Sequence, residues 1–249
     1  MTPGAVPTAR PELTPDHRRR WLIWTVGAVV LALALVVGGP LVYARVIAPA
    51  PREPLALTTA SPTVTPGADT TPVPLTAAGI EGSWNVGAGS QAGYRLGEVL
   101  SGQPVAVVGR TDKVTGTAVV AGGVLQSAEV VVDAASIVTD TSARDAYFRR
   151  ALNTTEFPTA TFSLTAPVDL AAVDGVSGPV TVSAPGTLTF HGVSQPVTAT
   201  LQVQGTASGV EVLGTIPVTL ADYQLQAPAL PFVTVDPSGT VEMLLRLTR

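Results

Sequence analysis

The sequence predicts an all-β domain of about eight antiparallel strands with one short helix, preceded by a transmembrane helix. Three observations support this prediction: short segments of alternating apolar and polar residues after Gly82, turn-forming residues between them, and an uncharged apolar stretch near the N-terminus. Alternation with a period of two is typical of strands with one buried and one solvated face. Strands at this spacing build a barrel or a sandwich, and the pattern alone does not separate the two.

The apolar stretch covers residues 21–44 and contains no charged side chain. Its 24 residues would span about 36 Å as a helix, which is enough to cross a bilayer. Three arginines at 18–20 precede it, so the positive-inside rule places residues 1–20 in the cytoplasm as a tail and the chain after the span outside. A cleaved signal peptide is the alternative, although its apolar core is usually only about 7–15 residues long. We therefore expect a single-pass anchor in the cell membrane and an extracytoplasmic domain.

Residues 45–80 are rich in Pro, Thr and Ala and are nearly uncharged. Such a segment buries too little apolar area to offset the entropy of ordering, so we expect an extended linker. Residues 81–249 are long enough for one hydrophobic core and form the predicted domain. The chain has no cysteine, which excludes disulfides, thiol catalysis and cysteine metal sites.

The alternating segments favour antiparallel strands. Their apolar positions are 94 and 96; 128, 130 and 132; 160, 162 and 164; 197, 199, 201 and 203; and 241, 243, 245 and 247. The separators have turn chemistry, with glycines in pairs or after His191, Ser208 and Ser238. Residues 144–152 can form one or two turns of the expected helix.

The charges and the two histidines exclude several function classes. Residues 81–249 carry eight basic and fourteen acidic side chains, a net charge of −6, which argues against nucleic acid as a partner. His17 precedes the apolar stretch and His191 is the only histidine in the domain, so no histidine cluster is available for a metal. A Ser-His-Asp triad would need His191 as its base, yet no G-x-S-x-G motif is present.

Three motifs occur in order along the domain. Residues 136–149 read S-I-x-T-D-x-x-x-R-D-x-x-x-R, residues 157–162 read F-P-T-A-T-F, and residues 188–197 read L-T-x-H-G-V-x-x-P-V. Together they resemble the YceI-like family, with the resemblance running from about residue 82 to residue 249. Members of that family are lipocalin-like β-barrels that bind polyisoprenoid lipids outside the cytoplasm.

The resemblance implies an eight-stranded lipocalin-like barrel with an apolar cavity for an isoprenoid lipid, such as a polyprenyl chain or an isoprenoid quinone. It implies ligand-binding roles for aromatic residues in or beside the motifs and for residues near the cavity mouth: Phe148, Phe157, Phe162, Phe190, Tyr94 and Arg144. The alternative for the aromatic residues is plain core filling, because an eight-stranded barrel is just wide enough either to be filled by side chains or to hold one ligand. His191 is expected in a hairpin turn, where histidine tolerates unusual backbone angles.

Arg144 and Asp145 match an Arg-Asp pair of the family. As sequence neighbours on a helix they point apart, so each is expected to reach a separate partner. In one interpretation Asp140 or Asp145 caps the helix and Arg144 pins the preceding loop. In the other, Arg144, Arg149 or Arg150 meets a polar lipid head group at the barrel mouth.

No catalytic residue, metal site or cofactor is expected, because no spacing fixes a pair of carboxylates within reach of each other. With the resemblance, which implies an isoprenoid lipid as ligand, we expect a non-enzymatic lipid carrier whose other partner, through residues 21–44, is the cell membrane. The sequence leaves open whether the protein forms a homodimer. The alternative function is an envelope interaction module with a filled barrel. An enzyme acting on an isoprenoid would need a polar cluster with perturbed pKa values inside the cavity.

Overall fold

The computed structural model describes residues 52–58, 73–100, 102–227, 229–230 and 233–249. The predicted cytoplasmic tail and transmembrane helix lie outside these residues. Within the described part of the chain, no helix is long and apolar enough to cross a membrane.

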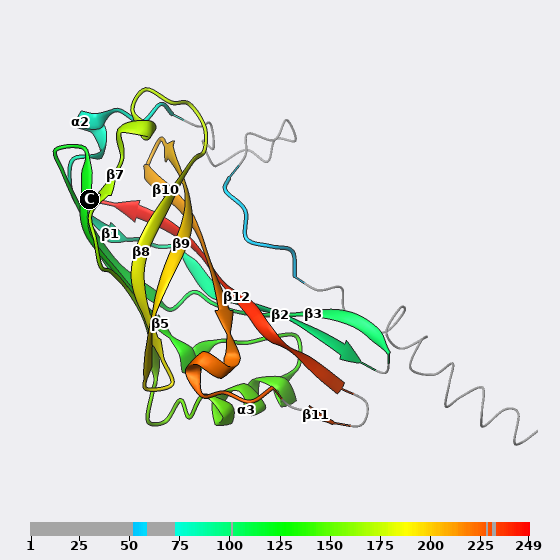
Figure 1. Ribbon diagram of the computed structural model, residues 1–249. Helices are drawn as coiled ribbons and strands as arrows, with labels where there is room; N and C mark the ends of the chain where they lie inside the picture. Colours follow the sequence, from blue (N-terminus) through cyan, green and yellow to red (C-terminus); the bar gives the residue numbers. More distant parts are fainter. Residues whose placement is uncertain (1–51, 59–72, 101, 228, 231–232) are drawn as a thin grey trace, which may run out of the picture. The chain divides into compact units, whose positions relative to one another are not determined.

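Antiparallel strands dominate the fold (Figure 1). The strands are β1 (Gly82–Val86), β2 (Gln91–Leu100), β3 (Gln103–Thr111), β4 (Val114–Ala121), β5 (Val124–Asp133), β6 (Thr159–Leu164), β7 (Val168–Asp169), β8 (Val180–Phe190), β9 (Val193–Thr206), β10 (Gly209–Thr219), β11 (Ala229–Leu230) and β12 (Val233–Thr248). The helices are α2 (Ala77–Ile80) and α3 (Ser142–Ala151), with 3-10 turns η2 (Ala134–Ser136), η3 (Ala171–Val173) and η4 (Leu220–Tyr223).

Backbone pairing closes eight strands into a barrel. Their order is β1-β4-β5-β6-β8-β9-β10-β12, and β12 returns to β1. This ring confirms the all-β prediction and decides for a barrel over a sandwich. The expected hairpin turn at His191 joins β8 to β9, with φ angles of 53° at His191 and 72° at Gly192. Positive φ at both central residues of a two-residue hairpin matches the right-handed twist of its strands.

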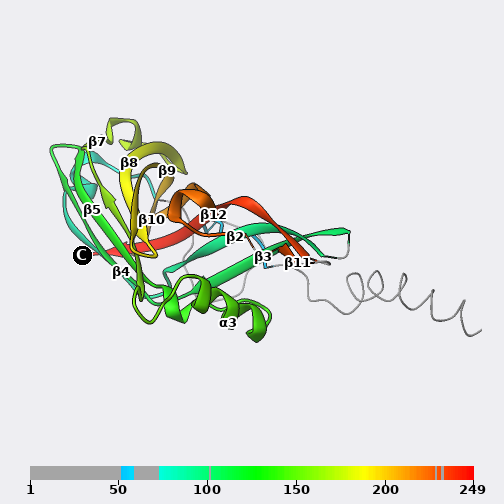
Figure 2. The same cartoon turned by 60° about the horizontal axis from the view of Figure 1, so that its bottom comes forward.

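The hairpin of β2 and β3, here called the wing, extends beyond the ring. β2 pairs with β12, and β3 pairs with β2 along its length. The other edge of β3 makes an isolated bridge between Arg110 and Val138. At the base of the wing the backbones approach closely, since a Cβ atom on Gly93 would lie 1.9 Å from the carbonyl oxygen of Gly109. Figure 2 shows the wing extending away from the ring, with α3 beneath the base of the wing.

The inward residues of the ring form the hydrophobic core. Phe162, Leu188 and Ile216 are buried there, together with the small residues Ala184 and Ala199. These residues occupy the inward positions of strands whose outward positions are polar, as the alternation predicts.

Residues 73–80, which their composition assigns to the linker, pack against the barrel. Val73 forms a backbone bridge with Gly205, and the side chains of Leu75 and Ile80 are buried in the core. The N-cap residue Thr76 accepts a hydrogen bond from the Gly79 N–H at 3.0 Å and starts the single turn of α2. Average composition conceals these two apolar residues, whose burial helps to anchor the segment.

Candidate ligand-binding cavity

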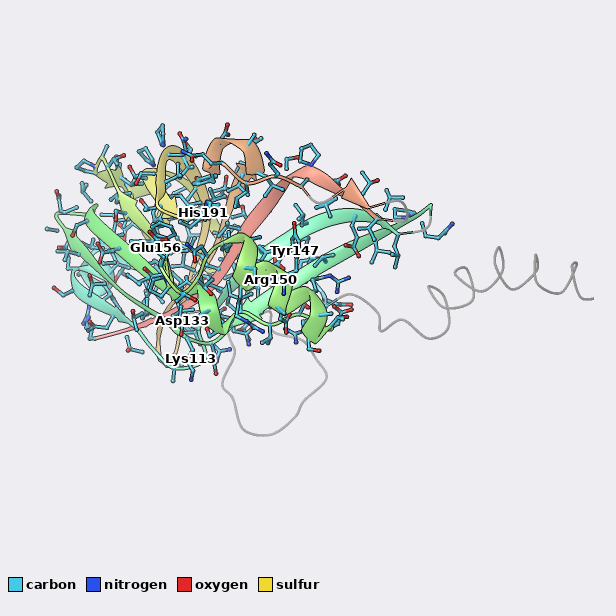
Figure 3. All side chains as sticks on the ribbon, turned by 90° about the horizontal axis from the view of Figure 1, so that it is seen from below. Lys113, Asp133, Tyr147, Arg150, Glu156 and His191 are labelled. Carbon is cyan, nitrogen blue, oxygen red and sulfur yellow. The ribbon has the colours of Figure 1, made fainter. Side chains whose placement is uncertain are left out.

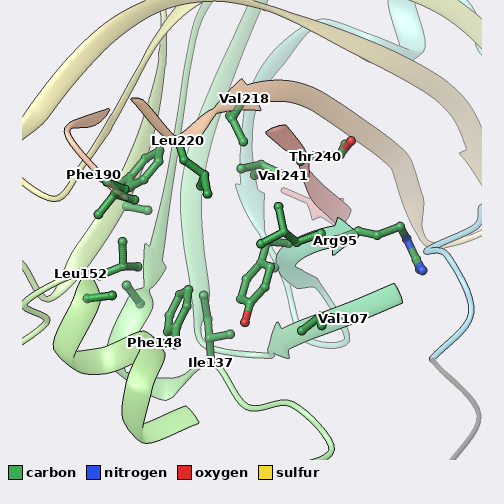
Figure 4. Close-up of a pocket in the computed structure, with 18 of the residues that line it drawn as sticks. Arg95, Val107, Ile137, Phe148, Leu152, Phe190, Val218, Leu220, Thr240 and Val241 are labelled. Carbon is green, nitrogen blue, oxygen red and sulfur yellow. The ribbon is translucent and has the colours of Figure 1, made fainter. Parts of the chain in front are cut away.

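A cavity of about 590 Å³ occupies the end of the barrel beneath α3 and the wing (Figure 4). This volume lies within the range of about 300–1,000 Å³ that is usual for small-molecule sites. Most lining residues are aliphatic or aromatic and come from β2, β3, β5, β6, β8, β10, β12, η4 and α3. The surface offered to a ligand is therefore overwhelmingly apolar.

α3 forms one wall of the cavity because its sequence repeats at helical spacing. Ala143, Tyr147 and Ala151 are four residues apart, and Phe148 and Leu152 continue the neighbouring row. Residues spaced in this way share one face of a helix. Phe148 and Leu152 on this face turn toward the cavity, Tyr147 stays exposed at its edge, and Arg150 on the other side of the helix is exposed (Figure 3).

The aromatic residues to which the family resemblance assigns ligand binding lie in two different parts of the structure. Tyr94, Phe148, Phe162 and Phe190 line the cavity, and the Tyr94 and Phe148 rings stack with centroids 4.9 Å apart. Phe157 lies outside the lining set. Its N–H donates to the Asn153 carbonyl at 2.9 Å in the turn after α3, and its ring meets the His191 ring edge-on at 5.8 Å. The turn after α3 therefore directs the Phe157 ring onto the β8–β9 hairpin.

Arg144 also lines the cavity, and its charge is already compensated. Its guanidinium lies 2.9 Å from a Glu98 carboxylate oxygen on β2 and 2.5 Å from Asp140 in the loop before α3. Glu98 is itself part of the lining. The ion pair thus ties α3 to the wing across the cavity mouth, and the group as a whole carries more negative than positive charge.

Asp145 points away from Arg144, as expected for neighbours on a helix. Its buried carboxylate accepts hydrogen bonds from the Thr139 N–H at 2.8 Å and the Thr139 hydroxyl at 2.7 Å. The N-cap residue Thr141 makes no side-chain capping bond. Asp145 therefore fixes the loop that enters α3 rather than the first N–H groups of the helix, and Arg144 pins that loop through Asp140.

Tyr94 supplies a protonated hydroxyl beside this ion pair. Burial raises its pKa well above the ordinary value, and the nearby carboxylates of Asp145 and Glu98 raise it further, while Arg144 opposes them. Tyr94 thus stays protonated throughout the physiological range. A protonated phenol can donate a hydrogen bond to a ligand oxygen.

Sequence reasoning missed several lining residues that have no motif around them. Val218, Leu220, Leu225 and Met243 come from loops and strands late in the chain, and Ile137, which was also missed, lies inside the first motif. Their apolar character alone does not distinguish cavity walls from filled core. The inward positions of β12 in the alternating pattern, at 241 and 243, were the available signal.

His191 lies outside the cavity lining. Its Nδ1 atom is 3.1 Å from the Tyr223 carbonyl oxygen, which holds the hairpin turn against η4. The described part of the cavity wall contains no His, Ser, Asp or Lys side chain. In the same described ranges, no group of three or more His, Asp or Glu residues is placed to hold a metal ion.

Comparison with known proteins relates the chain to one family. Residues 87–247 match the YceI-like domain. A solved polyisoprenoid binding domain from Saccharophagus degradans, implicated in plant cell wall breakdown, superimposes with a TM-score of 0.51 at 23% identity, covering 66% of this chain and 97% of that one. BcnA from Burkholderia cenocepacia gives a TM-score of 0.48 at 16% identity, covering 63% and 96%.

A comparison with curated proteins finds no match. The family match spans more than half of the 249 residues and contains the wing, α3 and the barrel strands other than β1. The chain belongs to the YceI-like domain family.

Proposed function

We propose that the barrel holds a polyisoprenoid lipid, with its tail in the apolar cavity and its polar end beside Tyr94 and Arg144. The observation that carries this proposal is the hollow end of the barrel, whose 590 Å³ cavity has an almost entirely apolar wall. An isoprenoid tail offers no hydrogen bonds, so its affinity comes from buried apolar area at about 25 cal/mol per Å². The family relationship and the polyisoprenoid binding domain of similar fold point to the same ligand class.

The charges at the mouth favour an uncharged head group such as that of an isoprenoid quinone. Arg144 is paired with both Glu98 and Asp140, so a phosphate there would meet two carboxylates and one guanidinium. Like charges in a partly buried site oppose each other. The Tyr94 hydroxyl can instead donate to a neutral carbonyl or hydroxyl oxygen.

The alternative of a filled barrel serving as an interaction module requires bulky side chains at the barrel centre. The cavity wall instead has the small residues Ala143, Ala151 and Ala160. A cavity lined by small residues supports a lipid carrier rather than an interaction module with a filled barrel.

Native mass spectrometry of the full chain, purified from a bacterial membrane extract, tests the proposal. We expect a stoichiometric bound lipid whose fragments differ by isoprene units. A clean unliganded mass, with no uptake of an added isoprenoid quinone or polyprenyl phosphate, would reject the carrier function.

We further propose that residues 21–44 anchor the protein in the cell membrane and that the barrel acts outside the cytoplasm. The proposed anchor and topology are supported by the length of the uncharged stretch and by the arginines before it. A reporter enzyme that is active only outside the cytoplasm, fused after residue 249, should be active. Activity of a cytoplasm-dependent reporter at the same position would contradict this topology.

A further inference from the structure

Residues 52–58, here called the strap, lie along the outer face of the barrel and not in its interior (blue in Figure 1). They belong to the stretch whose composition predicts an extended linker. The strap makes polar contacts with residues of β2, β3, β9 and β10 and with the loop before α3. These partners belong to three parts of the molecule: the barrel wall, the wing and the loop before α3.

At one end of the strap, every polar group of Thr58 is bound. Its N–H and its hydroxyl each donate to the Glu211 carboxylate at 2.8 Å, and its carbonyl accepts from the Gln204 amide at 3.0 Å. Glu211 and Gln204 are opposite each other on β10 and β9, and each is only 2% exposed. The nearest cation, on Arg246, is 3.6 Å from Glu211.

These contacts matter because a buried carboxylate is costly unless hydrogen bonds satisfy its oxygens. Gln204 donates one such bond to Glu211 at 2.8 Å, and Thr58 donates two. The strap thus completes the hydrogen bonding of a charged group built into the barrel wall. Gln204 and Glu211 form a site for an extended segment with a hydroxyl-bearing residue.

At the other end, the strap is held by two arginines of the wing. Arg95 donates to the carbonyl of Arg52 at 3.2 Å, and Arg110 donates to the carbonyl of Glu53. Both arginines also pair with the buried Glu242 carboxylate, at 2.7 Å and 3.5 Å. Figure 4 shows the Arg95 head group extending away from the rings of Phe148 and Phe190, toward the outside.

Arg52 connects the wing to the loop before α3. Its guanidinium donates to the Val138 carbonyl at 3.3 Å, and Val138 is the residue bridged to Arg110 at the free edge of β3. The neighbours of these residues, Tyr94 on β2 and Ile137 before Val138, both line the cavity. The strap therefore crosses the junction between wing and loop directly outside the cavity wall.

We propose that the strap is a clasp, which holds the wing against the loop before α3 and so slows the passage of a ligand through the cavity mouth. Inside the mouth, the Arg144–Glu98 pair links α3 to the wing. Outside, the strap secures the base of the same wing. Without the strap, the edge of β3 keeps only its own contacts with this segment, which include the Arg110–Val138 bridge and the 2.6 Å contact between the Thr111 and Ser136 hydroxyls, so the wing can move outward more readily.

The substitution Thr58→Pro in the full chain tests the clasp, because proline has neither the N–H nor the hydroxyl that Glu211 accepts. Thr58→Ser is the matched control, since serine keeps all three polar groups. The first readout is hydrogen exchange at the Arg110 and Val138 amides, which bond to each other's carbonyl oxygens at 3.0 Å. We expect exchange about tenfold faster in Thr58→Pro and unchanged in Thr58→Ser.

The second readout is replacement of a bound deuterated isoprenoid quinone by the unlabelled compound, followed by native mass spectrometry. A clasp predicts replacement about tenfold faster in Thr58→Pro. Faster amide exchange without faster replacement would overturn the clasp, and so would no change in either readout. Should Thr58→Pro fail to fold, Arg52→Gln tests the other end of the strap, because it removes the guanidinium that donates to the Val138 carbonyl.

The ligand readout rests on the proposed function, whereas the amide readout does not. If no variant binds an isoprenoid, the carrier proposal fails, and hydrogen exchange still decides whether the strap holds the wing.

Discussion

The two ends of the barrel are built from the same alternating strands, yet one is filled and the other is hollow. At the filled end, Trp84 is buried, its indole N–H donates to the Ile80 carbonyl at 2.8 Å, and the Arg249 guanidinium lies 4.8 Å above its ring. At the hollow end, α3 covers the opening and contributes Ala143 and Ala151 to the wall. Space therefore arises where the wing leaves the ring and small residues face inward.

An eight-stranded ring therefore does not by itself determine whether its interior is occupied. A large aromatic side chain and a closed ring fill one end. A splayed hairpin, a helix lid and small side chains leave room at the other. Substitutions at each end can therefore separate effects on stability from effects on ligand binding.

The largest effect is expected at the filled end. Trp84→Ala should lower the free energy of unfolding by about 3–5 kcal/mol, because it leaves a large void in a packed core. Asn85→Ala, at the neighbouring exposed position, is the control. Denaturant unfolding of the unliganded protein measures both. A loss below about 1 kcal/mol for Trp84→Ala would show that this end is not the stabilising core.

Filling the hollow end should abolish binding and spare the fold. Ala160→Phe places a ring in the cavity from β6, so we expect at least about a hundredfold loss of isoprenoid quinone affinity, as buried area for the tail is removed. The free energy of unfolding should change by less than about 1.5 kcal/mol. Quinone titration and thermal unfolding measure the two quantities.

Thr159→Phe is the matched control for that substitution, since Thr159 is exposed on the opposite face of the same strand. Equal affinity losses in Ala160→Phe and Thr159→Phe would contradict binding inside the cavity.

A smaller effect is expected on head-group choice. Glu98→Gln removes one negative charge beside Arg144 while keeping a hydrogen-bond acceptor. The ratio of polyprenyl phosphate to isoprenoid quinone affinity should rise about tenfold. Competition between the two lipids measures this ratio, with Glu129→Gln at an exposed site as the control. An unchanged ratio would mean that the head group lies away from Glu98.

The smallest effect concerns Tyr223, which stacks on the cavity residue Phe190 at 3.9 Å and whose buried hydroxyl has no partner in the described residues. Tyr223→Phe should raise the free energy of unfolding by about 1 kcal/mol at neutral pH. Burial raises the pKa of Tyr223 from 10.0 to about 12, so the folded state favours the neutral phenol. The contribution of this pKa shift to the free energy of unfolding is therefore complete below pH 10 and is lost as the pH rises toward 12.

Unfolding measured from pH 8 to pH 12 should then show a shallower alkaline decline in Tyr223→Phe than in the unchanged protein. Tyr147→Phe, at an exposed tyrosine, is the control. Identical alkaline declines in all three proteins would contradict the role of Tyr223.

Much of the fold could be predicted from local patterns, because strand alternation and turn residues act over short stretches. The inward set 160, 162 and 164, the His191–Gly192 turn and the helix after residue 141 all follow from neighbours in sequence. Choosing a barrel over a sandwich needed the family motifs, since the alternation is the same in both.

The remainder depends on contacts between distant residues. Thr58 meets Gln204 and Glu211, which lie 146 and 153 positions away, so composition alone assigns the strap to a linker. Phe157 falls within a family motif but is turned onto the β8–β9 hairpin by a bend that its own sequence does not reveal. The open space under α3 likewise requires the wing to leave the ring, which no single segment shows.

Photo-crosslinking with an isoprenoid quinone that carries a diazirine at the end of its tail tests the contrast between the two ends most directly. We expect labelled peptides from α3, β6 and β12 around the cavity, and loss of that labelling in Ala160→Phe. Labelling confined to the outer face, or to the filled end around Trp84, would contradict it.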